Sequence, residues 1–189
     1  MSAHEEIRAQ VRARFGAVAR DPKAERRFAM GRPSALALGY AAEELDALPP
    51  AAVERFAGVG CPLALGPIAA RARVLDVGAG SGVDALLAGR RGARVAAIDM
   101  TADMLRVAAR AAVDDVRFVR ALAEGLPFPE GTFDAALSNG VLNLCPDKPR
   151  ALAELARVLK PGAPLLAADI LLEEGVDEGT VKRLGAWSD

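Results

Sequence analysis

The sequence predicts an α/β fold in which a doubly wound parallel sheet of about five strands follows a helical N-terminal cap. Two patterns carry this prediction. From residue 71 onward, short apolar runs alternate with helical stretches, which indicates parallel strands joined by helices. The first of these runs leads into a glycine-rich turn and then directly into a helix. Ligands bind such sheets at the C-terminal ends of the strands, so we look for a functional site there.

Composition narrows the class of protein. The 189 residues are 52% hydrophobic and 26% charged, which is typical of a globular chain and not of a disordered one. The 24 basic and 25 acidic residues give a net charge of −1, whereas dedicated nucleic-acid binders usually have a basic surplus. With two cysteines, no apolar run of membrane-spanning length and no signal-like N-terminus, we expect a cytoplasmic protein without membrane or nucleic-acid partners.

Residues 1–70 are predicted to form a helical cap and linker, and residues 71–189 the α/β domain. Apolar side chains recur at helical spacing over residues 3–20, which indicates an amphipathic helix packed on the domain. A short segment follows through Met30, with a break at Gly31-Arg32-Pro33. Two short helices are predicted at 42–48 and 51–57, before a turn at Cys61-Pro62.

The second part of the chain alternates between the two element types. We expect helices after the first, second and fourth strands, with Thr101 capping the second helix and Pro161-Gly162 ending the third. The predicted strands are 73–77, 94–98, 116–120, 133–137 and 164–170, and the predicted helices are 83–91, 101–113, 147–159 and 180–187.

The glycine turn after the first strand is the first candidate site. Gly78, Gly80 and Gly82 remove side chains where a ligand would approach the backbone, and the following helix directs its free N–H groups at the turn. Asp76 lies inside the apolar strand, where a carboxylate is costly unless it serves the loop. The alternative is an ordinary tight turn with a hydrogen-bonded aspartate.

Three other strand ends carry candidate residues. Asp99 ends the second strand and could accept hydrogen bonds from a ribose diol, or cap the next helix, and Met100 could pack on an adenine. Ala123 and Glu124 follow the third strand, where an adenine edge would lie, although Glu124 could be a surface residue. Asn139 follows the fourth strand and could bind an amino-acid-like ligand end or cap a turn.

The sequence at this site is compatible with two kinds of nucleotide cofactor. The run from Gly80 to Ala85 also fits the dinucleotide fingerprint with alanine in its third place, so a dinucleotide-dependent reductase is one alternative. Asp76, Gly78 and the Pro-Gly pair before the fifth strand fit S-adenosylmethionine better. That cofactor has no pyrophosphate, and its sulfonium and amino-acid end favour carboxylate and backbone acceptors.

The run from Val74 to Gly82 resembles motif I of class I S-adenosylmethionine-dependent methyltransferases, and nearly the whole chain is similar to arsenite methyltransferases. The matching segments are Ile98-Asp99-Met100-Thr101, the string from Ser138 to Lys148, the string from Arg157 to Gly162, and Gly39-Tyr40, Glu43-Glu44-Leu45, Leu48-Pro49 and Gly58-Val59-Gly60-Cys61 upstream. The resemblance implies a Rossmann-like fold and S-adenosylmethionine as cofactor.

The resemblance also implies residue roles. The glycine turn with Asp76 would line the cofactor, Asp99 would hold the ribose and Met100 the adenine. Ala123 and Glu124 would lie at the adenine rim, and Asn139 near the methionine end. Cys61 matches a metalloid-binding cysteine of the family and is the predicted contact for the methyl acceptor; no resident metal is expected.

Three departures from the family pattern leave the acceptor open. Gly140 stands where arsenite methyltransferases have a cysteine after the Ser-Asn pair, and Cys145 is either a substitute ligand or an inert thiol. The family usually has two further strands and a later cysteine, so we expect a C-terminally short domain. The leading hypothesis is methyl transfer to thiol-bound trivalent arsenic; the alternatives are another small acceptor or a catalytically impaired cofactor-binding protein.

Overall fold

The computed structural model describes residues 2–25, 28–111 and 113–171, and its centre is a five-stranded parallel sheet. The strands are β1 (Arg73–Val77), β2 (Arg94–Asp99), β3 (Val116–Arg120), β4 (Ala135–Asn139) and β5 (Leu165–Ala168). Their order is β3-β2-β1-β4-β5, so the chain builds outward from β1 and then returns to its other side. This confirms the predicted doubly wound sheet, and its switch point lies between β1 and β4.

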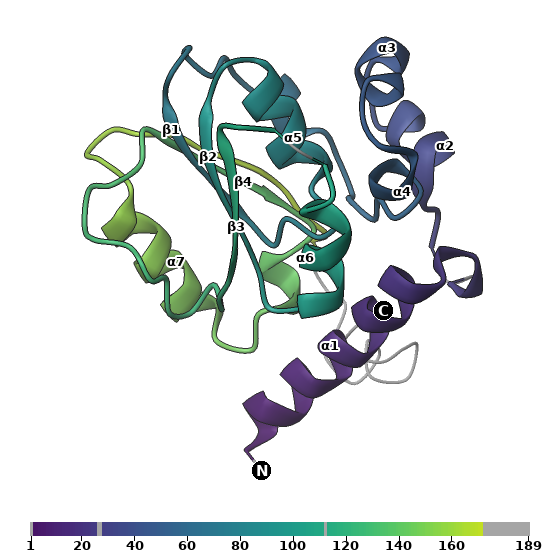
Figure 1. Ribbon diagram of the computed structural model, residues 1–189. Helices are drawn as coiled ribbons and strands as arrows, with labels where there is room; N and C mark the ends of the chain where they lie inside the picture. Colours follow the sequence, from purple (N-terminus) through teal and green to yellow (C-terminus); the bar gives the residue numbers. More distant parts are fainter. Residues whose placement is uncertain (1, 26–27, 112, 172–189) are drawn as a thin grey trace.

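Helices cover both faces of the sheet (Figure 1). On one side lie α5 (Val83–Arg90) and α6 (Ala102–Ala108), and on the other lies α7 (Lys148–Val158). Because successive strand residues point to opposite faces, Val74 packs in the core below α5 while Leu75 packs in the core below α7. The sheet therefore separates two apolar clusters.

In the residues that the structure describes before β1, all regular secondary structure is helical. It contains α1 (Ala3–Arg20), α2 (Gly31–Ala37), α3 (Ala42–Asp46) and α4 (Pro50–Val53), with single 3-10 turns at Pro22–Ala24 and Pro62–Ala64. A capping box between Ser2 and Glu5 starts α1, as the sequence pattern favours. Residues of α2 to α4 share the α5-side core, and α1 packs beside α6 through Val18 and Met104 (Figure 1). A domain boundary near residue 70 stays a prediction.

The predicted break at Gly31-Arg32-Pro33 is wrong, because α2 begins at Gly31. The N–H of Gly31 donates to the Phe56 carbonyl at 2.8 Å, and its φ of +71° is accessible to glycine. Pro33 falls in the first turn, where its missing N–H costs no helical hydrogen bond. Contacts with distant residues therefore decide where this helix starts.

Other boundaries differ by a few residues. Instead of 133–137, β4 covers Ala135–Asn139, because its register with β1 pairs Val74 with Ala135 and Val77 with Ser138. Phe133 lies before the strand and makes a single bridge to Leu159. Similarly, α6 ends at Ala108 and not at 113, and a helix predicted at 180–187 lies outside the described residues. In the part of the chain that is described, no helix is long and apolar enough to cross a membrane.

The two leucines of α7 provide a matched test of the packing. Leu155 is 1% exposed in the α7-side core, whereas Leu152 is 47% exposed on the same helix. We expect Leu155→Ala to lower the free energy of unfolding by about 2–5 kcal/mol through lost burial and a residual cavity. Leu152→Ala should change it by less than about 0.5 kcal/mol. Urea unfolding followed by circular dichroism measures both, and equal losses would contradict the described packing of α7.

Candidate functional site

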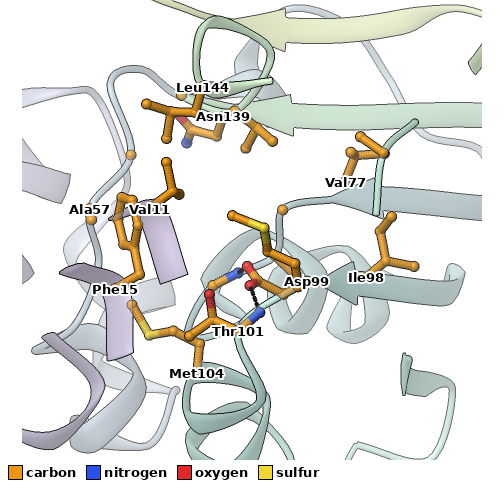
Figure 2. Close-up of a pocket in the computed structure, with 18 of the residues that line it drawn as sticks. Val11, Phe15, Ala57, Val77, Ile98, Asp99, Thr101, Met104, Asn139 and Leu144 are labelled. Atoms are coloured by element: carbon orange, nitrogen blue, oxygen red, sulfur yellow. Dashed lines mark hydrogen bonds between the residues drawn. The ribbon is translucent and has the colours of Figure 1, made fainter. Parts of the chain in front are cut away.

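A cavity opens at the C-terminal ends of β1, β2 and β4, where the topology predicts a ligand site. Its floor is formed by the glycine turn and the ends of the three strands. Side chains of α1 and the segment from Arg55 to Gly58 line the opposite side. Figure 2 shows Val11 and Phe15 across the cavity from Val77 and Ile98. A segment near the N-terminus thus closes a site built by the sheet.

The glycines of the turn have different reasons to be glycine. Gly78 lines the cavity with a φ of +69°, and a Cβ there would lie 2.3 Å from Val141 Cγ2. Gly82 is not among the lining residues that the structure describes. It lies behind the turn, where a Cβ would meet Ala108 at 3.0 Å and Phe118 at 3.2 Å. Glycine at position 78 leaves room for the Val141 side chain beside the cavity. Glycine at position 82 lets the start of α5 pack closely against Ala108 and Phe118.

Asp99 joins the end of β2 to both neighbouring turns. Its Oδ2 accepts a hydrogen bond from the Gly80 N–H at 2.9 Å, and its Oδ1 accepts one from the Thr101 N–H at 2.7 Å (Figure 2). Burial raises the pKa of this carboxyl group, and the two N–H donors act in the opposite direction. The carboxylate therefore secures the start of α6 and also lines the cavity, where its oxygens keep lone pairs free for a ligand.

Two further carboxyl groups are buried beside the turn. Asp84, in the first turn of α5, lines the cavity, and its oxygens accept from the Tyr40 hydroxyl at 2.6 Å and the Asn139 Nδ2 at 3.0 Å. Asp76 is 2% exposed, does not line the cavity among the described residues, and has one oxygen without a hydrogen-bond partner. Burial raises the pKa of both, and for Asp76 the charges of Asp84 and Asp99 add to the effect.

Sequence reasoning did not identify Asp84 or Tyr40 as site residues. A signal for Asp84 was present, because it is the one acidic residue in the otherwise apolar first turns of α5. No local pattern could pair it with Tyr40, which lies 44 residues earlier.

The side chain of Asn139 holds the segment Gly58–Gly60 against the end of β4. Its Oδ1 accepts from the N–H groups of Val59 at 2.8 Å and Gly60 at 3.1 Å, while its Nδ2 donates to the Gly60 carbonyl at 2.9 Å. The contact is close enough that a Cβ on Gly58 would lie 2.4 Å from Nδ2. These bonds reach residues 79 and 80 positions earlier in the chain, and contact of Asn139 with a ligand stays a prediction.

The remaining predicted residues follow the ends of β2 and β3. Met100, Ala123 and Glu124 all line the cavity. Glu124 is buried and pairs with Arg8 of α1, whose Nη2 lies 3.0 Å from its Oε1. Glu124 is therefore not the solvated surface residue of the alternative interpretation, and its ion pair ties α1 to the loop after β3.

The two cysteines lie on opposite faces of the sheet. Cys145 lines the cavity and packs in the α7-side core; burial, followed by the charge of Glu124, raises the pKa of its thiol to about 12. Cys61 is half-buried, packs against the α5-side core and is not among the described lining residues; burial also raises its pKa. The two thiols therefore do not form one chelating pair, and the acceptor role of Cys61 stays a prediction.

Gly140 occupies a backbone conformation that suits glycine. Its φ is +69°, its N–H donates to the Ala168 carbonyl at 2.8 Å, and a Cβ there would lie 3.3 Å from Val59 Cγ1. A cysteine at this position would be strained here. The backbone at position 140 therefore favours glycine over the cysteine that arsenite methyltransferases have there.

Several known proteins that this chain resembles are methyltransferases. Residues 75–167 match the family described as a methyltransferase domain. An arsenite methyltransferase of Aquipseudomonas alcaligenes is 38% identical over 59% of this chain and 36% of its own length, and a demethylmenaquinone methyltransferase of Clavibacter sepedonicus is 39% identical over 56% and 44%. The structure of an arsenic(III) S-adenosylmethionine methyltransferase from Chlamydomonas reinhardtii matches 75% of this chain and 50% of its own, at 32% identity and a TM-score of 0.54.

The chain thus resembles class I S-adenosylmethionine-dependent methyltransferases, arsenite methyltransferases among them. It spans less than half the length of these two curated relatives. The relatives are named as methyltransferases of different acceptors. The comparisons therefore agree on a methyltransferase domain but do not select an acceptor.

The site predicts an unusually weak acid at Cys145. In a Cys61→Ser variant, absorbance of the thiolate near 240 nm should stay absent as the pH rises from 7 to 10, because burial holds the pKa at about 12. Thiolate absorbance in that range that disappears on adding Cys145→Ser would contradict the described burial. An unfolded sample, in which the thiol regains an ordinary pKa, is the control.

Proposed function

We propose that this chain binds S-adenosylmethionine and transfers its methyl group to a small acceptor. The observation that carries the proposal is the placement of Asp99 at the end of β2, held between the glycine turn and α6 and facing a mainly apolar cavity. A carboxylate fixed in this way can accept both hydroxyls of a ribose. Ile98, Met100 and Ala123 provide apolar surface beside it for an adenine.

The electrostatics of the turn support this cofactor over a dinucleotide. A pyrophosphate needs the free N–H groups at the start of α5, but the Gly80 N–H already donates to Asp99. Asp84 stands in the first turn of the same helix, and Asp76 lies buried beside it. A pyrophosphate would make ionising these carboxyl groups still more costly, whereas a cationic ligand would lower that cost.

Within this proposal, the cofactor supplies a methyl group on a positively charged sulfur. The protein supplies position: the strand ends hold one side of the cavity, and α1 with the segment after Arg55 excludes water from the other. Holding two reactants in the correct geometry contributes up to about 7–11 kcal/mol to lowering a barrier. Positioning is therefore the main catalytic contribution that we assign to this chain.

The acceptor must be nucleophilic without first losing a proton to the protein, because each carboxyl group that lines the described cavity is already held by protein groups. Glu124 is paired with Arg8, Asp99 is bonded to two backbone N–H groups, and Asp84 is bonded to Tyr40 and Asn139. Thiol-bound trivalent arsenic carries an available lone pair, and the arsenite methyltransferase relatives support it as the first acceptor to test. A different small nucleophile is the alternative.

A second candidate function is cofactor binding without efficient catalysis. It is favoured by two observations together: glycine at position 140, and the two thiols on opposite faces of the sheet. Trivalent arsenic prefers several soft thiolates, and the cavity presents a single cysteine. An external thiol such as glutathione would have to complete its coordination.

Calorimetry with S-adenosylmethionine and NAD tests the cofactor. We expect binding of the former and none of the latter, because the turn is lined by carboxylates. Asp99→Ala should weaken cofactor binding roughly tenfold to a hundredfold, since hydrogen bonds to a charged group contribute about 1.5–3 kcal/mol. The exposed Asp115→Ala variant is the matched control. Binding of NAD alone would refute the proposal, and an Asp99→Ala variant with unchanged affinity would refute the ribose assignment.

The acceptor is tested with radiolabelled cofactor, arsenite and glutathione. We expect methylated arsenic, and we expect Cys145→Ser to lower its formation at least about tenfold because this is the thiol in the cavity. The parallel variant Cys61→Ser decides whether the family-matched cysteine takes part. Cofactor binding without methyl transfer to arsenite or to a panel of small thiols, amines and phenols would favour the second candidate function.

A further inference from the structure

Two buried carboxyl groups beside the cavity lack a cation to balance them. Asp76 is 2% exposed and Asp84 is 7% exposed, and the charge of Asp84 raises the cost of charging Asp76. No ion pair reaches either of them from the part of the chain that the structure describes. The nearest cationic influence on Asp84 is Arg91, whose guanidinium already pairs with Glu44 at 2.7 Å.

Such an arrangement is unfavourable by itself. Burying a carboxylate is costly unless it is hydrogen-bonded and paired with a positive charge. Asp84 is hydrogen-bonded through both oxygens, and Asp76 keeps one oxygen with no partner at all. Burial therefore makes charging these carboxyl groups costly, and a ligand cation beside Asp84 would lower that cost.

Only one of these two carboxyl groups lines the cavity. Asp84 lines the cavity, while Asp76 is set behind it. Each oxygen of Asp84 accepts a single hydrogen bond from the protein and so keeps capacity for a second donor. The sequence pattern favoured Asp76 for contact with the ligand, but the described cavity exposes Asp84 instead.

The partners of Asp84 fix its direction. The Tyr40 hydroxyl donates to Oδ1, and Asn139 Nδ2 bonds both Oδ2 and, at 3.1 Å, the Tyr40 oxygen. Asn139 in turn holds Val59 and Gly60, next to the segment that walls the cavity. The carboxylate is thus held by side chains from two separate parts of the chain, Tyr40 and Asn139.

We propose that Asp84, oriented by Tyr40 and Asn139, receives the positively charged methionine end of the cofactor. This inference rests on the proposed function and assigns a second carboxylate to it. Asp99 holds the adenosine part, Asp84 balances the cationic part, and Tyr40 acts as a positioning residue that does not itself bind the cofactor.

The test compares two ligands that differ at the methionine end. S-adenosylmethionine carries the charged amino-acid and sulfonium groups, whereas 5′-methylthioadenosine has the same adenosine part and no charge. We expect Asp84→Asn to weaken binding of the former roughly thirtyfold or more, because it removes one charge of a buried pair, and to leave the latter unchanged. Tyr40→Phe should weaken binding of the former roughly threefold to tenfold, again without affecting the latter.

Isothermal calorimetry on the full chain measures the dissociation constants of both ligands for the unaltered chain and for each variant, with Asp115→Asn as a charge-matched surface control. Equal loss of both ligands in Asp84→Asn would show a merely structural role and overturn the inference. Retained affinity in Asp84→Asn together with loss in Asp76→Asn would transfer the role to Asp76 and also overturn it. If the unaltered chain binds neither ligand, the proposed function itself fails, which is a different outcome from a failure confined to the Asp84 variants.

Discussion

The side-chain amide of Asn139 is the contact on which the arrangement of the site depends. It sits at the end of β4, beside the switch point, and bonds the backbone of Val59 and Gly60, the hydroxyl of Tyr40 and the carboxylate of Asp84. Its Oδ1 accepts two hydrogen bonds, and its two Nδ2 hydrogens are shared among three acceptors, the Gly60 carbonyl, the Tyr40 oxygen and Asp84 Oδ2. Removing them would leave several buried polar groups unpaired, which is costly in a low-dielectric interior.

Through this one residue, the N-terminal segment becomes part of the site. The sheet alone provides a floor of glycines and strand ends, open to solvent at the edge of the fold. The loop held by Asn139 and the first helix held by the Arg8–Glu124 pair supply the opposite wall. Exclusion of water strengthens every electrostatic interaction inside the cavity, so the same contacts that close it also make its carboxylates effective.

The charges and the thiols of the cavity lead to different conclusions about the reaction. The buried carboxyl groups of Asp76 and Asp84 and the partly buried Asp99 around the glycine turn suit a cationic cofactor, and they agree with the methyltransferase domain match at residues 75–167. The soft ligands are sparse, with a high-pKa thiol at Cys145 and a strained position for any cysteine at 140. The donor is therefore much better defined than the acceptor, as is also the case among relatives with different acceptors in their names.

The sequence by itself determined the number and approximate position of the strands, the glycine turn and the position of Asp99. Each follows from local rules: apolar runs separated by helical stretches, the backbone freedom of glycine, and the acidic end of the second strand. It failed at Gly31, where a hydrogen bond to Phe56 starts a helix that local propensity argues against. Only the tertiary structure decided that Asp84 and not Asp76 faces the cavity, that Tyr40 orients it, and that Cys61 and Cys145 lie apart. Contacts between residues 44 or 80 positions apart leave no local pattern, because they depend on how the strands and helices pack and not on the preferences of neighbouring residues.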